Sequence, residues 1–175
     1  MTSDPSTRLT GLVNFELVFH MLPGMCLVLD PAFTILAQNE EHARATLTVD
    51  RNVVGQNLFA AFPDNPNHSA ADGVSDVRAS LLKVLKTRQS DAMPLIRYDV
   101  QPVRGPFQTR WWQITNTPIL GADGYVQWII NRAEDVTELV ELRERAGRGW
   151  RRGERGRKGG NEMASKFHSD ETKHS

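Results

Sequence analysis

The sequence predicts an α+β domain with a five-stranded antiparallel sheet and short helices on one face. The order of patterns along the chain supports this fold. Two short apolar runs, 25–29 and 33–37, come first, helical patterns follow across 40–86, and three strand-like runs fill 93–134. Strands joined by short turns pair antiparallel, and the helices between them then cover one face of the sheet.

Composition narrows the class of protein. At 175 residues the chain can form one domain with its own core, but the 39% hydrophobic share places part of it outside that core. The formal net charge of zero predicts no polyanionic partner. The single cysteine, Cys26, excludes an intrachain disulfide. With neither an apolar run of membrane-spanning length nor a secretory signal pattern, we expect a cytoplasmic protein.

The N-terminal elements follow from capping and turn residues. Residues 12–22 form an amphipathic helical pattern with Asn14 as a possible cap, and Pro23-Gly24 ends it. Asp30-Pro31 supplies the turn of the first hairpin.

Three further helical segments are predicted. Asn39 caps residues 40–47, and residues 58–62 form one apolar turn that Pro63 stops. Residues 64–73 read as a loop. The longest helix, 74–86, has one apolar face that consists of Val74, Val77, Leu81, Leu82 and Leu85.

A three-stranded meander is predicted next, over 93–103, 108–120 and 125–134, with glycine-containing turns between the runs. The last run leads directly into a helical pattern from Leu139 to Arg145. Strand and helix meet without a loop, which is typical of a device that passes a signal out of a domain.

The chain divides into three parts. Residues 1–11 are a flexible N-terminus, 12–145 are the domain with its flanking helices, and 146–175 are a basic tail. Dense glycine and arginine predict disorder from about Gly147 onward. The tail either contacts phosphates, with Trp150 available for stacking, or is a solvated extension, and we favour the extension.

The order of these motifs resembles the PAS sensory-domain family, over about residues 14–145. The motifs that carry the resemblance are Pro23-Gly24, Asn39, Val53-Val54-Gly55, Asn116-Thr117-Pro118, Gly121-Ala122-Asp123-Gly124 and Asp135-Val136-Thr137. The resemblance implies a sensory module of bacterial signal transduction, in which haem, flavin, a small organic acid or no ligand occupies the pocket.

Two of these cofactors can be tested on single residues. Flavin-binding light sensors have Gly-Arg-Asn-Cys where this chain has Gly55-Gln56-Asn57-Leu58, and leucine cannot supply the thiol of the photoadduct. Cys26 lies in the first strand, where we expect a small apolar packing residue. For haem, the long helix has no histidine, so His68 in the preceding loop is the candidate ligand. We interpret His20 and His42 as surface or packing residues.

Strand alternation predicts a ligand pocket. A hairpin centred between Ala122 and Asp123 places one set of side chains toward the helices, which the resemblance makes the ligand-facing set. With the residues expected opposite, the predicted pocket comprises Phe59, Phe62, Leu81, Leu85, Trp112, Ile114, Asn116, Ile129, Asn131 and Ala133. The alternative is a packed core without a ligand, in which Asn116 and Asn131 bond each other or the backbone.

The other sheet face predicts an interface. Trp111, Trp128 and Ile130 lie on it with no core element left to cover them, so either the N-terminal helix or a second copy packs there. Asp135 and Thr137 form the predicted signal junction, since both side chains can bond backbone groups at a helix start.

These features predict a cytoplasmic sensory or dimerisation module. It binds a small molecule or protein partner and passes the change through its C-terminal helix, as a homodimer, to a histidine kinase or transcription regulator of a two-component system. No nucleophile–base pattern, phosphate-binding loop or metal-ligand cluster is present in the sequence, so we expect no enzyme activity. The alternative is a haem-based redox or gas sensor using His68. We expect neither membrane nor nucleic-acid binding.

Overall fold

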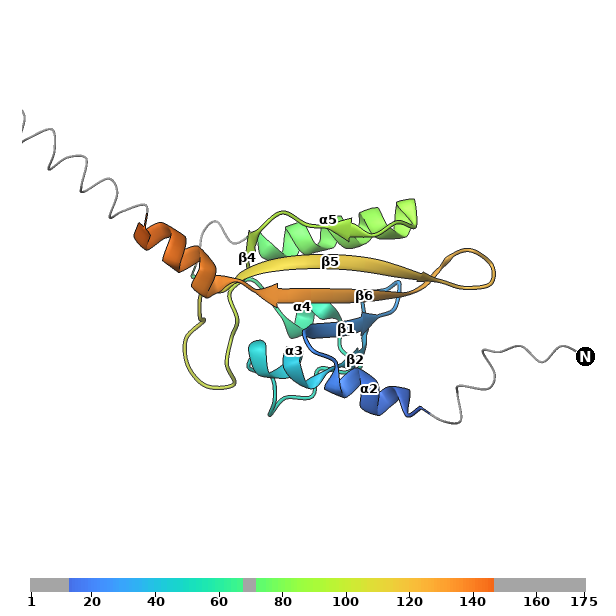
Figure 1. The fold of residues 1–175 in the computed structure, drawn as a ribbon, viewed down its shortest axis with the longest axis horizontal. Helices are drawn as coiled ribbons and strands as arrows, with labels where there is room; N and C mark the ends of the chain where they lie inside the picture. The colour runs from blue at the N-terminus through green and yellow to red at the C-terminus, as the bar shows by residue number, and fades with distance from the viewer. Residues whose placement is uncertain (1–12, 68–71, 147–175) are drawn as a thin grey trace, which may run out of the picture. The chain divides into compact units, whose positions relative to one another are not determined.

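The computed structural model describes residues 13–67 and 72–146. Their centre is a six-stranded antiparallel sheet in the order β2-β1-β6-β5-β3, with β4 also paired to β5 (Figure 1). The chain divides into two units with the boundary between Thr137 and Glu138. The α+β fold predicted from the sequence is therefore confirmed.

The N-terminal elements follow the predicted order. Helix α2, Phe15–Met21, begins at Asn14, whose Oδ1 accepts a hydrogen bond from Leu17 N at 3.0 Å. No residue of this helix is buried. Strands β1, Met25–Leu29, and β2, Ile35–Gln38, form the hairpin. Asp30 Oδ1 accepts from two backbone amides within its turn.

Three helices follow the hairpin: α3 (Glu40–Ala45), α4 (Leu58–Ala61) and α5 (Gly73–Thr87). Asn39 and Asn57 cap α3 and α4 through their side-chain oxygens. Arg88, in the left-handed conformation with φ 58°, ends α5.

The predicted buried face of α5 is wrong at one position. Leu81 is 0% exposed, whereas its neighbour Leu82 is 52% exposed. The buried stripe instead continues through Ser80 and Val84, so its centre lies on the Ser80 side of Leu81 and Leu82 is turned toward solvent.

The strand predicted over 93–103 is also wrong as a single element. Two short strands, β3 (Asp91–Ala92) and β4 (Ile96–Arg97), pair with β5 instead, and an isolated bridge joins Val100 to Gln108. Pro94 lies between the two strands and has no N–H to donate to the ladder. The sheet therefore has six strands where five were expected.

Strands β5, Trp111–Leu120, and β6, Val126–Asp135, form the long hairpin at the middle of the sheet. Ile114 pairs with Ala133 and Asn116 with Asn131, so the hairpin is centred between Asp123 and Gly124 rather than one residue earlier. Moving the centre by one residue shifts the pairing by two, and a shift of two leaves every side chain on its predicted face.

The hydrophobic core lies between one face of this sheet and the helices, with α3 packed near β1 and α5 near β5 (Figure 1). Leu27, Leu29, Ile35 and Ile129 supply fully buried side chains from the sheet. The core holds both layers in place around the cavity described below.

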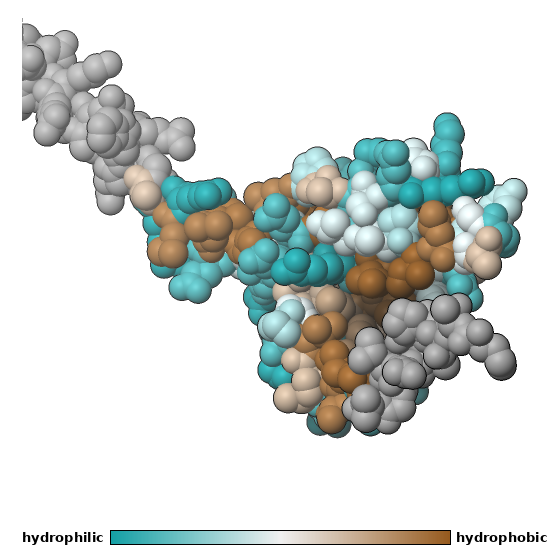
Figure 2. All heavy atoms as spheres, turned by 45° about the vertical axis from the view of Figure 1, so that its right-hand side comes forward, coloured by the Kyte–Doolittle hydropathy of each residue, from teal (hydrophilic) through white to brown (hydrophobic). Residues whose placement is uncertain are grey.

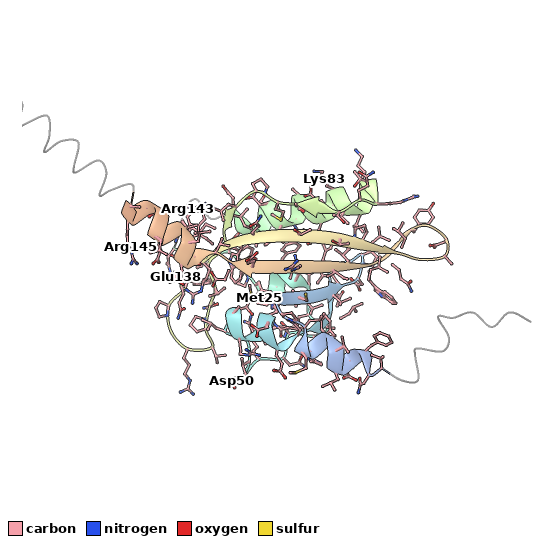
Figure 3. All side chains as sticks on the ribbon, viewed as in Figure 1. Met25, Asp50, Lys83, Glu138, Arg143 and Arg145 are labelled. Atoms are coloured by element: carbon pink, nitrogen blue, oxygen red, sulfur yellow. The ribbon has the colours of Figure 1, made fainter. Side chains whose placement is uncertain are left out.

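A further helix covers residues 137–146 and exposes Leu139 and Leu142. Glu138, Arg143 and Arg145 are polar residues of the same helix (Figure 3). None of the helices among the described residues has both the length and the apolar character needed to cross a bilayer. The predicted flexible N-terminus (1–11), the tail from Gly147 and His68 lie outside the described residues.

Candidate functional site

A cavity of about 70 Å³ lies between the inner face of the sheet and the helices. This volume exceeds what a single water needs, so the space admits several waters or a small organic group. Apolar side chains dominate the lining, and the main ones are Leu27, Leu58, Phe59, Phe62, Phe107, Trp112 and Ile114. An apolar cavity with a few polar groups is the usual composition of a small-molecule site.

Part of the predicted pocket lines this cavity. The six pocket residues predicted on the sheet are all buried. Four of these six line the cavity, and so do both predicted phenylalanines, which gives Phe59, Phe62, Trp112, Ile114, Asn131 and Ala133. Leu81, Leu85, Asn116 and Ile129 do not line it and instead pack in or beside the core. Ligand binding by the lining residues remains a prediction.

Trp112 is held by a hydrogen bond as well as by packing. It is 3% exposed, and its Nε1 donates to Tyr98 O at 2.7 Å. The Tyr98 hydroxyl donates in turn to Phe62 O, and burial raises the pKa of Tyr98, which keeps the phenol protonated. These bonds tie β5, the residues after β4 and the end of α4 together around the cavity.

A directed chain of hydrogen bonds reaches the cavity from the surface of α5. Lys83, on α5 in Figure 3, pairs with Asp91, and hydrogen bonds from Lys83 and Ser80 lower the pKa of this carboxyl group. An ionised carboxylate only accepts, so Ser80 donates to Asp91 Oδ2 at 2.6 Å and its oxygen accepts from Asn116 Nδ2 at 2.8 Å. Asn116 Oδ1 then accepts from Asn131 Nδ2 at 2.7 Å.

The direction of these hydrogen bonds determines which groups of the Asn131 side chain are left to face the cavity. One hydrogen of its amide nitrogen is donated to Asn116 Oδ1, which leaves the second N–H and the carbonyl oxygen for the cavity that the residue lines. The two amides do bond each other, as the alternative to ligand binding supposed. That bond still leaves Asn131 an acceptor for a ligand.

His42 was interpreted from the sequence as a surface or packing residue, and the structure places it in the wall of the cavity. It is 5% exposed, and burial lowers its pKa to about 3, so the ring is neutral. Gln38 Nε2 lies 2.9 Å from His42 Nδ1. Because an amide nitrogen only donates, Nδ1 accepts and the proton is on Nε2.

Arg51 is a second cavity residue that sequence reasoning missed. Its Nη2 donates to Ala61 O at 2.7 Å, and its guanidinium lies 5.6 Å from the centre of the Phe62 ring. Its Nε is buried without a partner among the described residues. The acidic group that lines the same cavity, Asp99, is already bonded to Arg97 and Asn65. Arg51 therefore contributes to the wall a positive charge that forms no ion pair among the described residues.

The sequence gives no signal for Arg51 and only a weak one for His42. Arg51 lies in an irregular polar segment, and His42 occupies a helix position that could equally face solvent. The earliest indication would have been a helix wheel centred on Asn39, because Asn39, His42 and Thr46 are spaced by three and four residues and share one side.

The predicted signal junction is built from four side-chain and backbone contacts. Thr137 Oγ1 accepts from Trp111 N at 2.9 Å, and Asp135 Oδ1 accepts from Thr137 N at 2.9 Å. The Thr137 hydroxyl also donates to Asp135, and Arg110 Nε lies 3.3 Å from Asp135 Oδ2. The first residue of helix 137–146 is thus bonded to both central strands.

The outer sheet face is partly open. Trp128 is 39% exposed, whereas Trp111 and Ile130 are half-buried. Trp128 pairs with Ile119, eight residues along β5 from Trp111, which is a separation of about 26 Å. The three predicted interface residues therefore share a face without forming one patch. Their role as an interface remains a prediction.

No cluster of three metal-ligating side chains occurs among the described residues. His42 lines the cavity, and with Gln38 Nε2 donating to its Nδ1 the proton is on Nε2. Cys26 is buried, and burial raises the pKa of its thiol against a smaller opposing effect of Arg132, so the reactive thiolate is disfavoured.

Comparisons with known proteins agree with this architecture. An RNA-binding Light-Oxygen-Voltage receptor has a TM-score of 0.58 at 21% identity, over 87% of this chain and 41% of that receptor. A PAS domain from Colwellia psychrerythraea gives 0.55 at 13% identity over 77% and 99% of the two chains. The PAS domain of nitrogen regulation protein NR(II) from Vibrio parahaemolyticus gives 0.52 at 15% identity over 70% and 98%.

These likenesses concern the fold, and the chain spans less than half of the first receptor's length. No curated protein sequence matches the chain. The family model described as "PAS fold" matches residues 19–141, which is most of the chain and nearly all of the unit with the cavity. The chain belongs to the PAS fold family.

Proposed function

We propose that this protein is a sensory module of signal transduction that binds a small molecule in the cavity between its sheet and helices. The observation that carries the proposal is the cavity itself: an apolar space with a few convergent polar groups, His42, Arg51 and Asn131, in its wall. Non-catalytic sensing is typical of PAS domains, and we assign no catalytic residue.

Strand β6 connects this cavity to the proposed output. Asn131 and Ala133 line the cavity, and Asp135 ends the same strand two residues later. A shift of β6 on ligand binding would move Asp135 and hence the Thr137 amide bonded to it. The strand therefore provides a short covalent path from ligand to helix 137–146.

The output partner belongs to the proposal as well. We propose that the module acts in the cytoplasm as a homodimer and passes its signal to a histidine kinase or transcription regulator. The exposed apolar residues of α2 and of the outer sheet face support self-association.

Native mass spectrometry of freshly purified protein tests ligand and oligomer together. We expect a dimer that loses a small-molecule mass on mild activation. Replacing Ala133 with Phe fills the cavity and should abolish the extra mass while the protein stays folded, and Ala122→Phe in the exposed hairpin turn is the matched control. An extra mass that survives Ala133→Phe would place the ligand elsewhere.

The alternative, a haem sensor, depends on His68, which lies outside the described residues. Adding haem to the purified protein would then give a Soret band that His68→Ala removes. A band that persists in His68→Ala, or no band at all, would exclude His68 as the ligand.

A further inference from the structure

We infer that the cavity is selective for a small carboxylate with an apolar, preferably aromatic, body. This inference rests on the proposed ligand-binding function and specifies the ligand chemistry of the same site. The inference depends on the polar groups of Arg51, His42 and Asn131, which differ in charge and in hydrogen-bonding role, and on the aromatic side chains of the same lining.

Arg51 supplies the charge. Its guanidinium carries a buried Nε–H with no partner among the described residues, and no carboxylate pairs with it there. A buried donor on a charged group is costly unless a ligand or water accepts from it. A carboxylate satisfies the donor and the charge together, whereas a neutral acceptor satisfies only the donor.

Asp99 does not cancel this preference. Arg97 Nε donates to Asp99 Oδ1 at 2.8 Å, and Arg97 Nη2 and Asn65 Nδ2 donate to Oδ2 at 3.0 and 2.7 Å. Both oxygens of this carboxylate are therefore occupied by other groups. Among the described residues of the lining, Asp99 therefore does not neutralise the positive charge of Arg51.

His42 adds a second donor. With Nδ1 accepting from Gln38, the imidazole offers Nε2–H, and His42 lines the same cavity as Arg51. Deep burial keeps the ring neutral, so it acts as a hydrogen-bond donor and adds no charge. Arg51 and His42 thus bring two donors to one lining, and a carboxylate has two oxygens that can accept from them.

The rest of the lining defines the body of the ligand. Phe59, Phe62, Phe107 and Trp112 contribute aromatic surface, and the indole N–H of Trp112 is already bonded to Tyr98 O. An apolar body, best a ring, gains most from these walls. Asn131, a lining residue on β6, leaves its carbonyl oxygen and its second N–H for a hydroxyl group on that ring.

Isothermal titration with benzoate, benzamide and 4-hydroxybenzoate tests the inference. We expect saturable binding in the order 4-hydroxybenzoate, benzoate, benzamide. Arg51→Met should weaken benzoate binding about tenfold to a hundredfold, the usual effect of losing a charge-assisted hydrogen bond, and should change benzamide binding much less. Arg51→Lys keeps the charge and should retain most of the preference for benzoate.

Controls separate this inference from the proposed function. Arg44→Met removes an exposed guanidinium that pairs with Glu40 and Glu41, and it should leave both affinities unchanged. Thermal melting of each variant without ligand shows that the fold persists. Benzamide binding as tightly as benzoate in the wild type and in Arg51→Met would overturn the carboxylate preference and leave a ligand-binding cavity. No binding of any of the three probes would overturn the inference and count against the proposed function too.

Discussion

Asn39 holds four backbone groups at the point where α2, β1 and α3 meet. Its Oδ1 accepts from Cys26 N and His42 N at 3.0 Å each, and its Nδ2 donates to Gly24 O at 2.8 Å and Leu22 O at 3.4 Å. The side chain is fully buried. One amide thus caps a helix and fixes the entry of the first strand, a role that goes beyond the cap expected from the sequence.

Asn39→Ala should destabilise the domain by about 2–4 kcal/mol, because several buried backbone groups lose their partners at once. Urea unfolding measures the change. Asn52→Ala is the matched control, since Asn52 is exposed and its side chain caps a single amide, that of Val54. If the two replacements lower the free energy of unfolding equally, the buried contacts of Asn39 do not stabilise the domain more than an exposed cap does.

His42 predicts a pH dependence of stability. Its pKa is lowered from 6.5 to about 3 by burial in the folded state, so between these values the unfolded chain binds more protons than the folded one. The contribution of His42 to the free energy of unfolding is therefore fully present above pH 6.5. Below that value the free energy of unfolding falls as pH falls, by up to about 1.4 kcal/mol per pH unit.

Urea unfolding at pH 7, 6 and 5 measures this slope. His42→Gln should flatten the slope over this range, whereas the same replacement at His20, on the exposed helix α2, should leave it unchanged. Carboxylates also contribute to the pH dependence of stability, but they do so equally in both variants, so the comparison between the variants isolates the effect of the histidine. An unchanged slope in His42→Gln would mean that another group controls the pH response.

At the scale of elements, capping and turn residues predicted most ends of the helices and strands. The remaining ends and the buried faces depend on how the elements pack against one another. Capping by Asn14 and Asn39 was readable because a cap acts within three residues. Pro94 divides a run whose β-branched and aromatic content still suggested one strand. Leu82 could not be separated from Leu81 by hydrophobicity, since only the position of the sheet selects which leucine is buried.

The candidate site was predictable in part for the same reason. Alternation placed Trp112, Ile114 and Asn131 on the inner face, and the face was correct although the hairpin centre was displaced. His42 and Arg51 were missed because they approach the cavity from segments whose orientation depends on long-range packing. The polarity of the cavity, which determines its ligand chemistry, was therefore not readable from the sequence.

The junction of β6 and helix 137–146 provides a prediction at the same scale. Asp135→Ala with Thr137→Ala removes the acceptors of Thr137 N and Trp111 N, each worth about 1 kcal/mol as a lost cap. Amide exchange across 139–145 should accelerate while the sheet stays protected. Asp123→Ala with Thr117→Ala, at the far end of the hairpin, is the control and should leave exchange in the helix unchanged. Unaltered protection of 139–145 in the junction variant would end the signalling role of this pair.

At the scale of the whole molecule, helix α2 and the outer sheet face are two of the surfaces that expose apolar side chains. Helix α2 exposes Phe15, Leu17, Val18 and Met21, and the outer sheet face exposes Leu36 and Trp128. Figure 2 shows apolar side chains (brown) gathered in patches on the face that it presents. Surfaces of this kind mark interfaces, so we propose that a second copy packs here.

The last prediction locates that interface. Val28 pairs with Ile130, and Trp128 lies on the same face two residues along β6, so these residues line one part of the outer sheet surface with Leu36 on the neighbouring strand β2. A charged side chain there would have to be desolvated on association, which is costly without a partner. Leu36→Glu and Trp128→Glu should each weaken self-association at least tenfold, as measured by sedimentation velocity across a concentration series.

Leu82→Glu is the matched control, because Leu82 is at least as exposed but lies on α5 in the helical layer. Trp111→Glu adds a second comparison at the opposite end of β5, where the separation from Trp128 predicts a smaller effect. If Leu82→Glu disrupts the dimer and Leu36→Glu does not, the interface lies on the helical layer and the outer sheet face must have another partner.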